Sequence, residues 1–345
     1  MRARTQQAIR IIAGVTLASA VFGASVSSFT PDGAGIGVFT GAVIGFVLST
    51  LGILMLGRWG RALQHWPLGV VFLLRTLIYG VVFMLVPNAM SALVHGTLAP
   101  FRDPTRVVTG TTLALSFGFA FCINFALTVS RLIGRRTMMS YVTGRYHRPR
   151  QEHRIVLFAD LIGSTKLGEQ LGDQKFHAFL NQVFWDMTEP VLEAGGEIDR
   201  YIGDEIVVSW LLPEGASAAK DPRPAAIACI FAIEDALNAR AERYRARFGT
   251  VPRFRAALHA GPLVLGEMGD VKREIVLLGD TMNTTSRIES VCRSSGYDYI
   301  ASAPAMPEPR ALPAGVHAEK LGPVELRGKL QVVELFGLKR VPPTS

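Results

Sequence analysis

The chain has 345 residues, 49% of them hydrophobic, and a mean hydropathy of +0.29, which is high for a wholly soluble protein and allows about two domains. Residues 1–150 hold 14 Arg, no Lys, two Asp and no Glu, a net +12, whereas the rest holds 22 basic and 26 acidic side chains, a net −4. The basic excess therefore lies in the apolar half, which favours a membrane partner and excludes nucleic acid as the expected one.

Four apolar segments in the first half are each about as long as the ~20 residues that cross a bilayer. They cover roughly residues 8–29, 36–57, 67–87 and 107–129. Eleven Arg flank them on the side of the two termini, against Arg102 and Arg106 on the other side. We therefore expect a four-span α-helical transmembrane domain, residues 1–130, in the cell inner (plasma) membrane, with the second half of the chain in the cytoplasm.

Arg75 lies inside the third apolar segment. Its side chain either makes a contact inside the bundle or with a ligand, or extends along the helix to the lipid headgroups. The loops on the outer side are too short for a folded ligand-binding domain. Any unknown ligand of the membrane domain would therefore bind within the bundle.

Residues 131–153 are predicted to form a cytoplasmic linker. This segment is polar and rich in Arg, and Pro149 argues against one continuous helix through it. The linker either transmits a signal or binds anionic lipid headgroups, and the sequence favours neither.

The second half alternates strand and helix patterns. Strands are expected at 155–160, 253–261, 274–279 and 332–338, a hairpin at 195–210, and helices at 173–195, 222–248 and 281–295, with a loop near 301–315. This alternation predicts a single α/β domain with a mixed sheet, residues 154–340.

Two carboxylates in this half stand at the ends of apolar strands. Asp160 ends the first strand, and Asp204 lies in the turn of the hairpin. A hairpin paired beside the first strand would bring the two together, and they would repel unless a cation lay between them. Their oxygens suit Mg²⁺ or Mn²⁺, and the small residues 162–165 after Asp160 could bring backbone N–H groups near a phosphate.

Asn283 and Arg287 are four residues apart in TMNTTSRIES. On a helix they project from one face, which presents an amide and a bidentate guanidinium to one ligand.

VLFADLIGST, GGEIDRYIGDEIVVSW and LLGDTMNTTSRIES, in this order, resemble the catalytic domain of the class III nucleotidyl cyclases, the adenylate and guanylate cyclase family. The resemblance covers roughly residues 154–338. It implies a ferredoxin-like βααββαβ core that works as a head-to-tail homodimer, with the nucleotide bound between two protomers. The implied reaction converts ATP to 3′,5′-cyclic AMP and pyrophosphate.

The resemblance also implies a role for each matching position. Asp160 and Asp204 match the pair that holds two divalent metals, with the backbone carbonyl of Leu161 as a further ligand. Asn283 matches the residue that orients the ribose, and Arg287 the one that stabilises the transition state. For the lysine that binds the triphosphate, Lys329 is the first candidate and Arg327 the second.

Two positions that would contact the base depart from the adenylate pattern of the family. Arg200 stands where a purine-reading Lys is common, and Val276 stands where the family has Asp or Thr. Arg200 can donate to the adenine ring, but Val276 cannot accept from the exocyclic amine. ATP is the expected substrate, with relaxed or guanylate specificity as an alternative.

Two other functions are considered. IGDEIVV is similar to the GGDEF hairpin of diguanylate cyclases, but Ile202 stands where that motif needs a second Gly. The departures at Arg200 and Val276 also allow a catalytically silent, nucleotide-binding signalling module. Retention of both Asp, Asn283 and Arg287 argues for the enzyme.

Overall fold

The computed structural model describes residues 3–27, 33–56, 66–96, 110–213, 215, 217–325 and 332–341. The chain divides into two compact units, Ala3–Met139 and the residues from Ser140 onwards. Each unit is described by itself.

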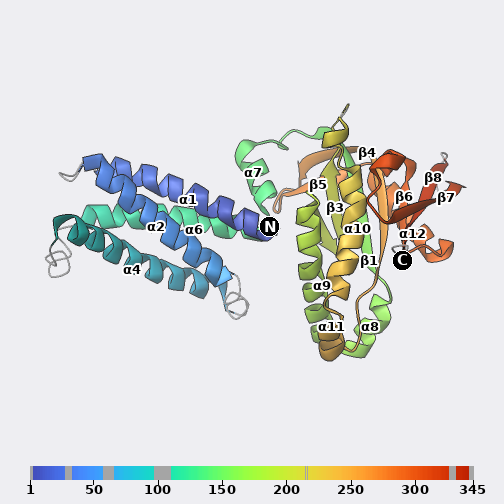
Figure 1. Cartoon of the computed structure of the whole chain (residues 1–345), viewed down its shortest axis with the longest axis horizontal. Helices are drawn as coiled ribbons and strands as arrows, with labels where there is room; N and C mark the ends of the chain where they lie inside the picture. The colour runs from blue at the N-terminus through green and yellow to red at the C-terminus, as the bar shows by residue number, and fades with distance from the viewer. Residues whose placement is uncertain are drawn as a thin grey trace. The chain divides into compact units, whose positions relative to one another are not determined.

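The first unit is a bundle of long apolar helices, α1 (Ala3–Ser27), α2 (Gly33–Leu56), α4 (Leu68–His95) and α6 (Gly110–Leu132) (Figure 1). By length and composition α1, α2 and α4 contain membrane-spanning stretches, Ala8–Val26, Gly35–Ile53 and Gly69–Val94. The apolar stretch of α6, Ala114–Ser130, is shorter than these. Three of the four expected spans are therefore confirmed as candidates, and the fourth segment is a helix.

Helices α1 and α2 pack closely because small residues face each other. A Cβ added to Gly41 would lie 2.2 Å from the carbonyl oxygen of Ser19, and one added to Gly45 would lie 2.7 Å from the Ser19 side chain. Helices in a membrane associate through such small-residue contacts. The Arg75 side chain on α4 is only 8% exposed, so it is buried in the bundle and does not extend to its surface.

The second unit is built on a mixed sheet flanked by helices (Figure 1). Its elements in chain order are α7 (Arg135–Thr143, which begins in the first unit), β1 (Arg150–Leu161), α8 (Ser164–Leu171), α9 (Asp173–Glu193), β2 (Glu197–Ile202), β3 (Glu205–Leu211), α10 (Arg223–Asn238), α11 (Ala241–Phe248), β4 (Phe254–Met268), β5 (Glu274–Leu278), α12 (Asp280–Ser295), β6 (Tyr299–Ser302), β7 (Val316–Val324) and β8 (Val333–Arg340). Short 3₁₀ turns lie at 218–220, 303–305 and 309–311.

The strand order is β2-β3-β1-β4-β6-β8-β7, with β5 paired to the far part of β4. Within the run β2-β3-β1-β4 each strand is antiparallel to the next. Together with α8, α9 and α10 they form the predicted βααββαβ ferredoxin-like core. Beyond this core, β6 runs parallel to β4 and makes the sheet mixed.

Several boundaries differ from the expected ones. The predicted helix 222–248 is two helices, α10 and α11, which are separated at Ala239 and Arg240. Strand β4 continues through Pro262 to Met268, and β1 begins at Arg150, inside the expected linker. The expected loop at 301–315 contains the end of β6 and two 3₁₀ turns. Residues 150–161 of β1 pair with residues 254–265 of β4, and β5 pairs with the last part of β4, which explains both strand extensions.

The two faces of the sheet have different coverings. On β1, Ile155, Leu157 and Ala159 pack in the main core with residues of α9 and α10, two helices that lie side by side in Figure 1. The alternate residues Val156 and Phe158 face the other side, in a smaller cluster that includes Tyr146 from the segment before β1. By this alternation Asp160 belongs to the second face, which is the face that α12 covers through Ile288 and Cys292.

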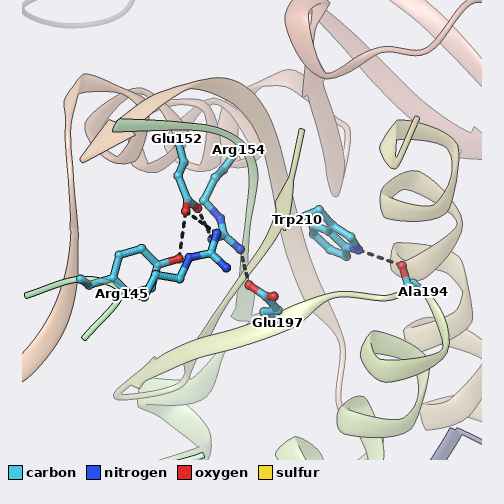
Figure 2. A network of polar contacts seen from close by, with 7 residues as sticks. Arg145, Glu152, Arg154, Ala194, Glu197 and Trp210 are labelled. Carbon is cyan, nitrogen blue, oxygen red and sulfur yellow. Dashed lines mark hydrogen bonds and ion pairs between the residues drawn. The ribbon is translucent and has the colours of Figure 1, made fainter. Parts of the chain in front are cut away.

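A buried ionic network fixes the start of β1 (Figure 2). The Arg154 guanidinium, with no exposed side-chain area, donates to Glu152 at 3.0 Å and to Glu197 on β2. Arg145 and the Tyr146 hydroxyl also donate to Glu152, each at 3.0 Å. Burial works to raise the pKa of Glu152, but the Tyr146 hydrogen bond and the two arginines outweigh it and lower that pKa. The network joins the end of the linker to β1 and, past the intervening strand β3, to β2, the strand that carries Arg200.

Candidate active site

Asp160 and Asp204 are brought together by the pairing of β1 with β3. In the register of these strands Asp160 lies opposite Glu205, the residue directly after Asp204. Gly203 completes the tight turn between β2 and β3 with φ of 61°, a left-handed conformation that glycine adopts without strain. The predicted proximity of the two carboxylates is present within one protomer.

Both carboxyl groups are on partly buried residues. The Asp160 side chain is 16% exposed, and burial together with the charge and hydrogen bond of Asp204 raises the pKa of Asp160 to about 7. Glu205 has its pKa raised to about 7 as well, by burial and by the charges of Glu289 and Asp160. Burial is the largest cause in both cases, and the excess negative charge at this edge of the sheet adds to it.

Three residues at this edge were not predicted from the sequence: Glu205, Glu289 and Arg293. A guanidinium nitrogen of Arg293 lies 3.7 Å from the Asp160 carboxylate and 3.5 Å from that of Glu289. Both Glu289 and Arg293 come from the second half of α12. The i,i+4 spacing of Glu289 and Arg293 was a detectable signal for their ion pair.

The donor set fits a hard divalent cation. Among the described residues no group of three or more His, Cys, Asp or Glu side chains is arranged to hold a metal ion. Mg²⁺, however, binds through one or two carboxylates and completes its shell with water and substrate phosphates. Two neighbouring carboxylates, one with its pKa raised to about 7 by burial and by the charge of the other, therefore suit Mg²⁺ or Mn²⁺ that arrives with a nucleotide.

The turn after Asp160 begins at the end of β1. Leu161 is the last residue of the strand, with a buried side chain, and the N–H of Ile162 donates to the Arg253 carbonyl at 2.9 Å. Gly163, with φ of 75°, precedes the first residue of α8. The N–H of Ile162 is thus used inside the fold, so a phosphate at this turn would rely on the residues that follow it.

Asn283 and Arg287 both lie on α12, as the spacing predicts. The buried side chains of this helix are Thr281, Thr284, Thr285, Ile288, Glu289 and Cys292. Asn283 is exposed and Arg287 is half-buried, so the two share a face turned away from the sheet. An amide and a guanidinium one turn apart are available there to a ligand.

Within one protomer the carboxylate pair lies beside the second half of α12, whereas Asn283 and Arg287 lie in the first half. Arg293 contacts Asp160, whereas Arg287 is six residues and Asn283 ten residues closer to the start of the helix. At 1.5 Å of rise per residue these positions lie about 9 and 15 Å further along the axis. A nucleotide held on Asp160 and Asp204 is therefore poorly placed for Arg287 of the same chain.

The expected base-contacting residues lie on two strands. Arg200 is on β2, and Val276 is on β5, paired with Gly266 of β4. Glu274, two residues before Val276, is exposed, and Lys272 lies 2.5 Å from its carboxylate. The hydrogen bond and charge of Lys272, with a smaller contribution from Arg200, lower the pKa of Glu274. Glu274 is the one side-chain acceptor on β5, two residues from Val276.

Lys329 and Arg327, the two candidates for the triphosphate, lie outside the described residues. Strand β8, which begins directly after that segment at Val333, occupies the position in the sheet between β6 and β7.

Comparisons with known proteins agree on one family. Residues 147–339 match the model of the adenylate and guanylate cyclase catalytic domain. Adenylate cyclase 2 of Rhizobium meliloti (strain 1021) is 37% identical over 270 residues, which cover 77% of this chain and 73% of that protein. Guanylate cyclase 2D of Rattus norvegicus is 30% identical over 176 residues, covering 50% of this chain and 15% of that protein.

A solved structure supports the fold. The structure of a bacterial light-regulated adenylyl cyclase matches with a TM-score of 0.54 and 19% sequence identity, covering 67% of this chain and 65% of that one. With the carboxylate pair, the α12 motif and the ferredoxin-like core in place, the chain belongs to the class III nucleotidyl cyclases, the family of adenylate and guanylate cyclases.

Proposed function

We propose that this protein is a membrane-bound adenylate cyclase, which converts ATP to 3′,5′-cyclic AMP and pyrophosphate at sites between two protomers of a homodimer. The observation that carries the proposal is the adjacent pair of carboxylates, Asp160 and Asp204, beside an α12 that presents Asn283 and Arg287 elsewhere on its length. The similarity to Adenylate cyclase 2 of Rhizobium meliloti supports ATP as the substrate.

Asp160, Asp204 and the backbone carbonyl of Leu161 would hold two Mg²⁺ or Mn²⁺ ions. When bound, these ions lower the pKa of the ribose 3′-OH and neutralise charge on the triphosphate. Neither Asp needs to act as a base, since both serve as charged oxygen ligands.

The partner protomer completes the site through α12. Its Asn283 would orient the ribose by hydrogen bonding, which holds the 3′-OH in line with the α-phosphorus. Its Arg287 would donate to the phosphoryl oxygens as negative charge develops on them and as pyrophosphate leaves. Lys329, or Arg327 in its place, would bind the triphosphate. The offset of these residues from Asp160 within one chain supports the two-protomer arrangement.

Arg200 would donate to the purine ring, with Val276 alongside as an apolar wall. A pocket of this kind reads adenine through one donor and through shape, and rejects GTP less well than a pocket with a matched acceptor. A cyclase with relaxed or guanylate specificity is the alternative that Val276 favours.

The helices α1, α2, α4 and α6 would act as four spans of the inner (plasma) membrane, with both termini and the catalytic unit in the cytoplasm. The asymmetric distribution of Arg supports this orientation.

An assay with purified full-length protein tests the function. ATP and Mn²⁺ are supplied, and both bound nucleotide and released pyrophosphate are measured. Release of pyrophosphate with equimolar cyclic AMP is the expected result. Binding of ATP with no turnover would identify the silent signalling module, and a cyclic product from GTP alone would identify a guanylate cyclase.

A further inference from the structure

Four carboxylates gather at the edge of the sheet where β1 ends. Asp160 is on β1, Asp204 is in the turn before β3, Glu205 begins β3, and Glu289 is on α12. Burial is the largest cause of the raised pKa of Asp160, and the charges of Asp204 and Glu289 add to it. This edge of the sheet therefore carries an excess of negative charge.

Arg293 on α12 is placed to balance part of this charge. One of its guanidinium nitrogens lies 3.7 Å from the Asp160 carboxylate and 3.5 Å from the Glu289 carboxylate. Within the described part of the chain no other basic side chain lies within 4 Å of the Asp160 carboxylate. The charge of Arg293 also opposes the rise in the pKa of Asp160. Arg293 is thus a built-in cation at a carboxylate that suits a metal ion.

The Arg293 side chain can leave Asp160 at little cost. It is 62% exposed, and an exposed ion pair contributes little to stability. Glu289 stands four residues earlier on the same helix, a spacing that keeps the two side chains beside each other. The guanidinium therefore keeps one partner when it has left the other, and a cation of higher charge can displace it from Asp160.

We propose that Arg293 competes with the divalent cation for Asp160 and thereby sets the metal affinity of the catalytic unit. The inference rests on the proposed function, in which Asp160 and Asp204 hold the metal ions. A guanidinium beside Asp160 neutralises part of the carboxylate pair and repels an incoming cation. Glu289 holds the guanidinium once it has been displaced. Arg293 thus raises the concentration of free Mg²⁺ that the cyclase needs.

Binding of Mn²⁺ without nucleotide tests this proposal on the full-length protein in nanodiscs of a zwitterionic lipid at pH 8. Electron paramagnetic resonance measures free Mn²⁺, so the Kd is obtained without turnover. Arg293→Gln removes the charge and keeps a polar side chain at an exposed position. It should bind Mn²⁺ roughly 3- to 10-fold more tightly than wild type, because the repulsion between one exposed charge and a divalent ion is lost. Unchanged or weaker binding would overturn the proposal.

Two further variants separate the charge from the structure. Arg293→Lys keeps the charge and should bind Mn²⁺ within about twofold of wild type. Arg245→Gln is the matched control, because it removes an exposed arginine from the last turn of α11, as Arg293→Gln does from α12. It reproduces any loss of interaction with the helix dipole and should leave the Kd unchanged. Tightening in either variant equal to that of Arg293→Gln would contradict a charge effect at Asp160.

Asp160→Asn distinguishes failure of this inference from failure of the proposed metal site. It should weaken Mn²⁺ binding, and Arg293→Gln should tighten binding less in about 0.5 M salt than in about 0.05 M salt, because salt screens an exposed charge. Weak binding by Asp160→Asn, with equal affinities for wild type and Arg293→Gln, would refute the role of Arg293 and leave the metal site standing. Binding that is unchanged in Asp160→Asn would refute the metal site, and the role of Arg293 with it.

Discussion

Asp160 at the end of β1 lies beside Asp204 in the turn between β2 and β3, close enough for the charge of Asp204 to help raise the pKa of Asp160, and Arg293 of α12 lies 3.7 Å from Asp160. The same helix presents Asn283 and Arg287 about 15 and 9 Å away along its axis. In the proposed arrangement one protomer supplies two half-sites, the carboxylate pair to one nucleotide and Asn283 with Arg287 to the other. Two protomers arranged head to tail would bring both half-sites, one from each protomer, to each nucleotide.

Mixing two inactive variants should restore activity. Asp160→Asn removes a metal ligand from one half-site, and Arg287→Ala removes the guanidinium from the other. Each isolated heterodimer has one of its two sites intact, so about half of wild-type activity per dimer is expected. The measurement is cyclic AMP production after the two proteins have been co-expressed and their heterodimers isolated by two affinity tags.

A mixture that contains heterodimers but stays inactive would rule out the shared site. Mixing Asp160→Asn with Asp204→Asn is the control, because both changes damage the same half-site. Cyclase activity should not recover in this control mixture.

The affinity for Mn²⁺ should fall with pH below about 7. Asp160, with its pKa raised to about 7, carries a proton at lower pH, and this proton must leave before the carboxylate binds a cation. Between pH 8 and pH 6 the deprotonated fraction drops about tenfold, and the apparent affinity should drop with it. Titration calorimetry with Mn²⁺ in two buffers of different ionisation enthalpy measures the affinity and the protons released.

The Asp160→Asn protein should show both weaker Mn²⁺ binding and a flatter pH profile. An affinity that is constant from pH 6 to pH 8 in the wild-type protein would contradict the raised pKa. Glu205, which also has its pKa raised to about 7, can contribute to any slope that remains in the variant.

Selectivity for the base depends on which residue accepts from adenine. If Val276 lines the base pocket, Val276→Asp should raise the ATP to GTP ratio of kcat/KM roughly 10-fold, because one hydrogen bond worth about 1.4 kcal/mol is gained. If Glu274 already accepts from adenine, Val276→Asp changes nothing and Glu274→Ala lowers the ratio. Steady-state kinetics of both variants with both nucleotides decides between the two.

Breaking the network in Figure 2 should destabilise the catalytic unit. Arg154→Met leaves the Glu152 and Glu197 carboxylates without their buried partner, at a cost of about 2–4 kcal/mol in the free energy of unfolding. Arg148→Met, at an exposed position, is the control and should cost less than about 0.5 kcal/mol. Denaturant unfolding followed by tryptophan fluorescence compares the two, and equal stabilities would contradict a structural role for Arg154.

Much of the catalytic fold could be predicted because its pattern is local. The alternation in VLFAD and in the hairpin around Gly203 defines three adjacent strands, and the hairpin turn sets the register that brings Asp204 to Asp160. The 3.6-residue period of α12 places Asn283 and Arg287 on one face. These signals lie within single elements or between neighbouring ones.

The missed features depend on contacts between distant segments. Strand β6 is only four residues long and is stabilised by β4 and β8, and β7 is recognisable mainly through its pairing with β8. Glu289 and Arg293 join the candidate site only because α12 packs beside the end of β1. No periodicity in the sequence encodes that placement.

The most direct test of the account measures cyclic AMP and pyrophosphate from ATP and Mg²⁺ by full-length wild type, Asp160→Asn, Asp204→Asn and the exposed-loop control Asp270→Asn. Each site variant removes one metal-binding charge with little change in side-chain volume, so both should lose activity at least about 100-fold while their thermal unfolding midpoints stay close to wild type. Asp270→Asn should retain full activity. Cyclic AMP formation at wild-type rates by either Asp160→Asn or Asp204→Asn would contradict the assignment of this carboxylate pair as the centre of the reaction.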